Sequence, residues 1–187
     1  MNIDSLVRNN VKQMSSYCSA RDDFKKDYDK KLIYLDANES PFKNGINRYP
    51  DNKYIKLKKV FSNIKNVHVN QVVLGNGTDE ILDLIIRVFC NPFKDKIITL
   101  PPTYGMYDVI AKTNGVDNIE IPLTSDFSIN KNEILKLNST NIKVLFLCSP
   151  NNPTGNSFDT NDLTDLIKGF KGIVVVDEAY IDFSTKE

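Results

Sequence analysis

The pattern of apolar positions divides the chain into two parts. Near the N-terminus, apolar residues recur at helical spacing at Ile3, Leu6, Val7, Val11 and Met14. This spacing predicts an amphipathic helix. Residues 19–31 are strongly charged and indicate a solvated connection. We therefore expect an N-terminal helical arm over residues 1–34 and a larger domain over residues 35–187.

From residue 71 onward, short apolar runs alternate with segments of helical periodicity. The runs that predict strands are 71–74, 96–100, 119–123, 143–148 and 173–176. The segments that predict helices are 78–90, 104–114, 130–137 and 159–170. Strands that alternate with helices and are apolar on both faces are typical of a mainly parallel sheet covered by helices. We therefore expect an α/β fold with three layers, in which ligands bind beyond the carboxyl ends of the strands.

The composition argues against several classes of protein. The 187 residues include 24 Lys+Arg and 24 Asp+Glu, so a zero net charge gives no long-range attraction for nucleic acid or anionic lipid. Three widely spaced cysteines, no CxxC pair and a single histidine, His68, argue against a metal site or a disulfide scaffold. Cys90 and Cys148 lie in apolar runs that are too short to cross a bilayer. We therefore expect buried thiols and a cytoplasmic location, with no membrane partner.

Four polar clusters directly follow predicted strands: GNGTDE, PPTYG, SPNNPTG and DEAY. The glycines of the first cluster allow a tight turn before a helix, whose first amides and dipole favour an anion. A phosphate would sit well at Gly77, Thr78 and Asp79. The segment matches neither a Walker A loop nor GxGxxG, so it is not a nucleotide-binding fingerprint. Taken alone, the segment favours the alternative, a turn and helix cap without a ligand.

The other clusters contribute a carboxylate, an amide and two phenol rings. Asp177 follows a buried strand, where a carboxylate needs a partner such as a protonated ring nitrogen, an Arg, a Lys or a metal. Asn152 lies on a proline-restricted loop, while Tyr104 and Tyr180 offer a flat ring and a phenol to the same edge. Singly, these residues also suit a helix cap, an Asn-Pro turn or core packing. Together with the phosphate site they describe pyridoxal 5′-phosphate, which has a phosphate, a ring nitrogen and a ring oxygen.

With these motifs, the chain resembles the N-terminal part of the pyridoxal-phosphate-dependent aminotransferases of fold type I. The matching stretches are LDANESPF, NRYPD, GNGTDEILDLIIRVFC, PPTYGMYDV, CSPNNPTGN and VVVDEAYIDF, in the family's order. ANESP, NRYPD and PPTYGMY are more specific for the histidinol-phosphate branch of the family. The resemblance implies that residues 35–187 are part of an aspartate-aminotransferase-like large domain, truncated before its C-terminal part and the small domain.

The resemblance also implies a role for each residue at the strand ends. The turn at residues 77–79 would hold the cofactor phosphate, and Tyr104 would stack on the ring. Asn152 and Tyr180 would donate hydrogen bonds to the phenolic oxygen of the ring. Asp177 would pair with the protonated ring nitrogen and keep it cationic.

Two roles implied by the resemblance concern the substrate and a second subunit. Tyr49 would reach the cofactor phosphate of the neighbouring subunit in a homodimer, and Asn38 would lie near the substrate. The implied reaction is amino transfer between L-histidinol phosphate and 2-oxoglutarate, which yields imidazole-acetol phosphate and glutamate. This is a step of histidine biosynthesis.

The chain departs from the family pattern by what it lacks. The Ser-Lys motif whose lysine binds the cofactor covalently is absent, as is the arginine that binds the substrate's acidic group, and Lys186 has no Ser-Lys context. We therefore assign no catalytic residue to this chain and expect the polypeptide alone to be inactive and poorly soluble. The alternatives are a pyridoxal-phosphate decarboxylase of the threonine-phosphate type, a non-catalytic phosphate-binding or cofactor-binding fragment, and a product without activity.

Overall fold

The computed structural model describes residues 2–18, 33, 35–137 and 139–184, which form two compact units. One unit joins Met1–Gln13 to Gly75–Glu187, and the other is Met14–Leu74. The first unit contains a sheet with its covering helices, and the second contains helix α3 (Ile55–Lys65) and a 3-10 turn, η2 (Val69–Gln71). The sequence-based division at residue 34 stays a prediction, and residues 19–32 and Lys186 lie outside the described residues.

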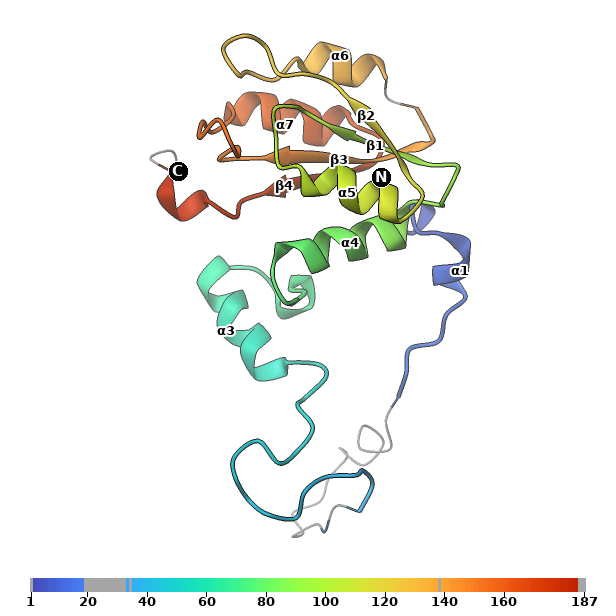
Figure 1. Ribbon diagram of the computed structural model, residues 1–187, viewed down its shortest axis with the longest axis vertical. Helices are drawn as coiled ribbons and strands as arrows, with labels where there is room; N and C mark the ends of the chain where they lie inside the picture. Colours follow the sequence, from blue (N-terminus) through green and yellow to red (C-terminus); the bar gives the residue numbers. More distant parts are fainter. Residues whose placement is uncertain (1, 19–32, 34, 138, 185–187) are drawn as a thin grey trace. The chain divides into compact units, whose positions relative to one another are not determined.

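Four strands of the first unit form a single parallel sheet (Figure 1). They are β1 (Lys96–Thr99), β2 (Asp117–Glu120), β3 (Ile142–Cys148) and β4 (Ile173–Asp177), in the spatial order β2-β1-β3-β4. All three neighbouring pairs are parallel. Parallel neighbours need crossover connections, and these contain α5 (Met106–Thr113), α6 (Lys131–Lys136) and α7 (Thr160–Gly169). The prediction of an α/β fold with a parallel sheet is confirmed.

The helices cover both faces of this sheet. Helices α4 (Thr78–Phe89) and α5 lie on one face, and α6 and α7 lie on the other (Figure 1). The connection from β1 to β2 runs in one direction across the sheet, and the connections from β2 to β3 and from β3 to β4 run in the other. Because crossovers between parallel strands are right-handed, α5 lies on one face of the sheet and α6 and α7 lie on the opposite face. Asp159 caps α7, because its carboxylate accepts a hydrogen bond from the Asn161 backbone N–H at 2.8 Å.

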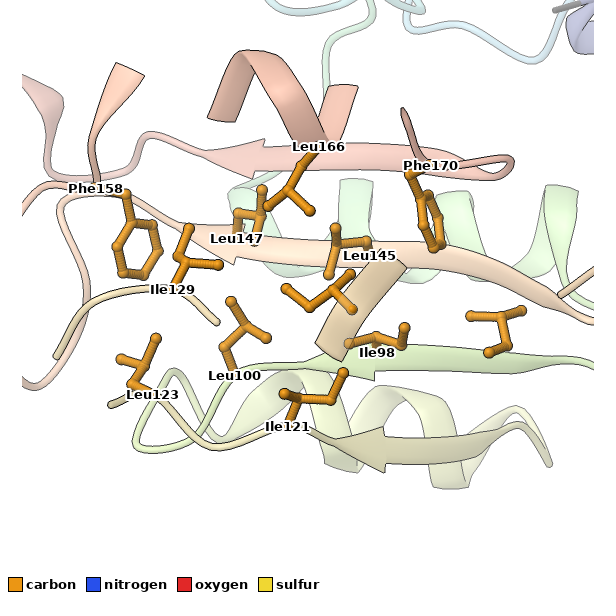
Figure 2. Close-up of a cluster of buried hydrophobic side chains, with 12 residues drawn as sticks. Ile98, Leu100, Ile121, Leu123, Ile129, Leu145, Leu147, Phe158, Leu166 and Phe170 are labelled. Atoms are coloured by element: carbon orange, nitrogen blue, oxygen red, sulfur yellow. The ribbon is translucent and has the colours of Figure 1, made fainter. Parts of the chain in front are cut away.

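One core cluster fills the space between the sheet and helices α6 and α7 (Figure 2). Its labelled members in Figure 2 are Ile98, Leu100, Ile121, Leu123, Ile129, Leu145, Leu147, Phe158, Leu166 and Phe170. Leu145 and Leu147 come from alternate positions of β3, and both are completely buried. The period of two in a strand thus places Leu145 and Leu147 on this face.

A second core cluster fills the opposite face and orients the end of β4. It contains Val144, Phe146 and Cys148 of β3 with Leu82, Ile86, Tyr107 and Ile110 of the helices. Ile173 and Val175 of β4 pack against this second cluster. Asp177 is two residues beyond Val175, so the same alternation directs its side chain toward the α4–α5 face.

The predicted continuous N-terminal helix is observed as two short helical segments. The structure contains a 3-10 turn, η1 (Ile3–Ser5), and a four-residue helix, α1 (Asn9–Lys12). Arg8 lies between them with ψ of 142°, outside the helical region. Its backbone N–H donates to the Val88 carbonyl at 3.0 Å, and its Nη1 donates to the Arg87 carbonyl at 2.8 Å. The helix is interrupted because Arg8 satisfies the C-terminal carbonyls of α4 instead of its own helix.

Two other predicted strands differ from the observed elements. Residues 71–74 form no strand in the described chain, and Val72 is extended with φ of −102° and ψ of 123°. An extended segment becomes a strand only where a neighbour pairs with its backbone groups. The predicted strand at 119–123 is observed earlier, at Asp117–Glu120. Pairing nevertheless continues, because the N–H groups of Ile121 and Leu123 donate to Thr99 and Pro101 carbonyls.

Two of the three cysteines, Cys90 and Cys148, have the buried environment that the sequence predicted. Cys90 and Cys148 are buried thiols without a disulfide, and Cys18 is exposed. Burial, reinforced by the Asp95 carboxylate, raises the pKa of Cys90 to about 12. Within the described part of the chain, no group of three or more His, Cys, Asp or Glu residues could hold a metal ion. No described helix is both long enough and apolar enough to span a bilayer.

The close approach of Gly172 to β3 generates a stability prediction. A Cβ at this position would lie 2.4 Å from the Lys143 carbonyl oxygen and 2.7 Å from Phe170 Cε1. We expect Gly172→Ala to reduce the free energy of unfolding by about 1–3 kcal/mol, the usual cost of overpacking. Chemical denaturation of the whole protein measures this change.

The matched control for this prediction is Gly105→Ala. Gly105 has a φ of −65°, and a Cβ there would meet nothing within 4 Å. We expect a change within about 0.5 kcal/mol, as for an ordinary surface substitution. Equal unfolding curves for both variants would contradict the close packing of β4 against β3.

Candidate active site

A cavity of about 260 Å³ opens at the carboxyl end of the sheet in the first unit. Its lining consists of Asn76, Gly77, Thr78, Asp79, Tyr104, Cys148, Asp177, Ala179 and Tyr180. These residues come from the N-terminus of α4, the loop before α5, and the ends of β3 and β4. Six of the nine residues singled out in the sequence therefore line one cavity, and their roles stay predictions.

The turn before α4 depends on two glycines and one glutamate. Gly77 has a φ of +84°, which side-chain-bearing residues rarely adopt. A Cβ on Gly75 would lie 2.7 Å from Ile81 Cδ1. Glu80 in the first turn of α4 accepts hydrogen bonds from both the backbone N–H and the side-chain amide of Asn76. Glu80 thus holds the turn from inside the helix, a role that the sequence analysis missed.

The first amides of α4 are available to an anion. The N-cap residue Gly77 has no side chain, and among the described residues no side chain caps this helix. The carboxylate of Asp79 accepts a hydrogen bond from the Tyr104 hydroxyl, with Oη 3.1 Å from Oδ1. Because a carboxylate repels a phosphate, the group that Asp79 can offer to an anion is its backbone N–H.

Asp177 is the buried charge of this cavity. Only 6% of the residue is exposed. Its Oδ1 accepts a hydrogen bond from the Ala179 backbone N–H at 3.1 Å, and its Oδ2 accepts one from the Tyr107 hydroxyl at 2.8 Å. Two oxygens of a carboxylate offer about four lone-pair positions, so Asp177 keeps capacity for a further donor in the cavity.

Tyr107 was not identified from the sequence. It is 1% exposed, its ring stacks on Phe146 with centroids 4.9 Å apart, and its edge contacts the Tyr104 ring at 5.5 Å. Burial, together with the nearby Cys148 and Asp177, raises the pKa of Tyr107 well above its usual range. The available signal was its position three residues after Tyr104, since residues at this spacing share one helix face.

Asn152 lies beside the main cavity in an adjoining cavity of about 360 Å³. Tyr180 lines both cavities. The loop itself is held by the neighbouring Asn151, which accepts a hydrogen bond from the Thr103 hydroxyl and donates to the Pro102 carbonyl and the Thr154 hydroxyl. Asn151 is therefore the structural amide of this loop, whereas the Asn152 side chain makes no hydrogen bond to the described residues.

The predicted residues Asn38 and Tyr49 belong to the second unit, where a glutamate joins their two segments. The Glu39 side chain is 2% exposed and pairs with the Arg48 guanidinium at 2.5 Å. It also accepts the Tyr49 backbone N–H at 2.8 Å. Glu39 thereby links ANESP to NRYPD and fixes the backbone at Tyr49. The roles of Asn38 and Tyr49 toward cofactor and substrate stay predictions.

The contact between Glu80 and Asn76 generates a binding prediction. We expect Glu80→Ala to weaken pyridoxal phosphate binding by the whole protein about tenfold, or about 1.4 kcal/mol, because the turn loses a charged acceptor. Glu80→Gln keeps an acceptor and removes a negative charge near the anion, so we expect its affinity to equal or exceed that of the wild type. Equilibrium dialysis against the apoprotein measures both values.

The matched control for Glu80 is Glu133→Ala. Glu133 also lies in the first turn of a helix, α6, on the other face of the sheet. We expect this substitution to leave the affinity unchanged. Equal affinities for Glu80→Ala and the wild type would contradict the positioning role of Glu80.

Comparisons with known proteins identify relatives of this chain. Residues 34–187 match the family described as "Aminotransferase class I and II". The chain is 57% identical over 183 residues to the histidinol-phosphate aminotransferase of Flavobacterium psychrophilum, covering 98% of this chain and 53% of that protein. The chain thus spans about half the length of the curated relatives it matches.

Two solved structures share the fold. The histidinol-phosphate aminotransferase of Clostridium acetobutylicum superposes with a TM-score of 0.64 at 29% identity, covering 73% of this chain and 40% of that one. The enzyme of Sinorhizobium meliloti in complex with pyridoxal-5′-phosphate gives a TM-score of 0.67 at 18% identity, covering 74% and 38%. On the family match over residues 34–187, this chain belongs to the class I and II aminotransferases.

Proposed function

We propose that the whole protein is a pyridoxal-phosphate-dependent aminotransferase that acts on L-histidinol phosphate and 2-oxoglutarate. In this proposal the present chain supplies the cofactor pocket. The observation that carries it is the buried Asp177 carboxylate at the carboxyl end of β4, on the same cavity as the uncapped N-terminus of α4. An anionic group and a cationic ring nitrogen on one small molecule match these two features.

The residues of the cavity fit the phosphate of this cofactor. The backbone N–H groups of Thr78 and Asp79 begin a 12-residue helix whose N-cap carries no side chain. The helix dipole adds a favourable field for a phosphate dianion, and Gly77 lets the backbone approach closely. Thr78 lines the same cavity, and its hydroxyl would add a donor.

The remaining residues fit the ring. Tyr104 lines the cavity next to the helix N-terminus, and its hydroxyl is tied to Asp79 at 3.1 Å, which restrains its ring. Tyr104 would therefore cover one face of the ring by stacking. The Asn152 amide and the Tyr180 phenol would donate to the ring oxygen, because Tyr180 lines both neighbouring cavities.

The chemistry divides between the cofactor and the chain. When bound, the cofactor supplies an electron sink for charge that develops at the amino-acid α-carbon. Asp177 holds a proton on the ring nitrogen by placing a negative charge beside it. The α4 amides anchor the phosphate, and Tyr104 excludes water from one ring face. Proton transfer at the α-carbon is assigned to no residue of this chain.

The substrate assignment rests on the relatives and on the motifs of the second unit. The F. psychrophilum and C. acetobutylicum proteins are both histidinol-phosphate aminotransferases. ANESP and NRYPD, the segments that carry the resemblance to that branch, are joined here through Glu39. Asn38 would lie near the substrate in this proposal.

The central test of the proposal is Asp177→Asn in the whole protein. An amide keeps the size of the side chain and removes the charge that stabilises the ring cation. We expect kcat/KM for glutamate formation from L-histidinol phosphate and 2-oxoglutarate to fall by about 10²–10³-fold, as for loss of one catalytic electrostatic contact. The assay follows glutamate production from L-histidinol phosphate and, in a parallel reaction, carbon dioxide release from O-phosphothreonine.

Asp117→Asn is the matched control, because this carboxylate is exposed at the start of β2 and pairs with Lys96 at 3.2 Å. We expect it to keep full activity. Release of carbon dioxide from O-phosphothreonine, with no glutamate formed from L-histidinol phosphate, would replace the proposed aminotransferase by the decarboxylase. Wild-type activity in Asp177→Asn would remove the proposed role of the carboxylate.

We further propose that the protein works as a homodimer, with Tyr49 of the partner subunit reaching the cofactor phosphate. The support is local: the Tyr49 backbone is held by Glu39, while 64% of the residue is exposed. A fixed backbone with an exposed phenol suits a side chain that reaches into a neighbouring subunit.

Mixed dimers test this arrangement. Asp177→Asn and Tyr49→Ala are each expected to lower activity strongly in the pure form. In a mixed dimer with sharing between subunits, one of the two sites receives both intact residues. We therefore expect co-expression of the two variants to restore activity toward half of the wild-type value per mixed dimer. No restoration, or a monomer in sedimentation analysis, would contradict the proposal.

A further inference from the structure

The carboxylate of Asp177 is held by a phenol from the facing helix layer. The Tyr107 hydroxyl donates to Asp177 Oδ2 at 2.8 Å, and both residues are buried. The two residues are 70 positions apart in the chain and meet because β4 ends on the α4–α5 face. On the other side the Ala179 backbone N–H, at 3.1 Å, holds Oδ1.

The geometry around Tyr107 makes its hydroxyl a fixed donor. Its ring is stacked on Phe146 with an interplanar angle of 6°, so the phenol has no freedom to swing away. Burial, Cys148 and Asp177 raise its pKa, and the hydroxyl therefore keeps its proton at every pH at which an enzyme of this kind works. The hydrogen bond to Asp177 is thus present whenever the pocket is folded.

A buried carboxylate needs such a donor. Removing one partner of a buried charge leaves that charge underpaired, which costs more than the net worth of the bond. Two donors on opposite oxygens also fix the rotation of the carboxylate about its terminal bond. Tyr107 touches the ring of Tyr104 as well, with centroids 5.5 Å apart at 87°, so one side chain supports two walls of the cavity.

We propose that Tyr107 is a positioning residue that aims the ionised Asp177 carboxylate at the cofactor's ring nitrogen. The inference rests on the proposed function, since it presumes that pyridoxal phosphate occupies the cavity. Tyr107 acts through Asp177 and is not itself expected to touch the cofactor nitrogen. Its effect is therefore specific to ligands that carry a nitrogen at that ring position.

The test compares two ligands on the apo form of the whole protein. One ligand is pyridoxal phosphate, and the other is its carbocyclic analogue, in which a C–H group replaces the ring nitrogen. Tyr107→Phe keeps the ring, its stacking on Phe146 and its contact with Tyr104, and deletes only the hydroxyl. We expect the dissociation constant for pyridoxal phosphate to rise about tenfold and that for the analogue to change less than twofold.

The matched control is Thr99→Val. Thr99 is also buried and donates one side-chain hydrogen bond, to Asn118 Oδ1 at 3.0 Å, on strand β1. This variant loses a hydrogen bond of the same kind without touching the cavity. We expect it to lower the unfolding midpoint but to leave both dissociation constants unchanged.

A double-mutant cycle completes the experiment. Asp177→Asn should show the same ligand selectivity with a larger amplitude, and adding Tyr107→Phe to it should change neither dissociation constant further. Equal weakening of both ligands by Tyr107→Phe, or no weakening of either, would overturn the inference. Failure of the proposed function gives a different result, because the wild type itself would then fail to prefer pyridoxal phosphate over the analogue.

Discussion

A negative charge withdrawn from water organises the carboxyl end of the sheet. Asp177 is 6% exposed, and the desolvation of an ionised carboxylate is too costly to remain uncompensated. Two hydrogen bonds offset part of that cost, one from its own backbone two residues later and one from a phenol on α5. The lone pairs left over face a cavity that begins at a helix N-terminus. A cationic ring with an anionic substituent would complete the compensation at both ends.

The fold could be predicted from the sequence because its signals are local. Apolar runs such as 143–148 and 173–176 are typical of strands in a parallel sheet, and both are strands here. An aspartate directly before a helix commonly caps it, as Asp159 does for α7. The sequence-based predictions of secondary structure were wrong where a contact with another segment decides the local structure. Residues 71–74 have strand composition but no paired neighbour among the described residues, and Arg8 breaks a helical pattern to satisfy carbonyls of α4.

The candidate site was predictable in its outline and not in its supports. Tyr104 and Asp177 follow the strands β1 and β4, so the topology gathers them at one edge of the sheet, and Gly77 joins them as the N-cap of α4. Tyr107, Glu80 and Asn151 hold these residues in position, and each does so through a side chain whose direction depends on tertiary packing. A carboxylate in the first turn of α4 is expected from the sequence to interact with the helix dipole. In the structure, the Glu80 carboxylate instead accepts a hydrogen bond from the Asn76 backbone N–H in the preceding turn. Such contacts leave no periodic trace in a sequence.

The alternation along β4 carries an evolutionary consequence. Ile173 and Val175 pack on the α4–α5 face, and Asp177 shares their parity. Gain or loss of a single codon between Gly172 and Asp177 would turn the carboxylate to the opposite face, away from Tyr107, while leaving an apolar strand that still pairs with β3. The spacing within this strand is therefore fixed by the chemistry at its tip.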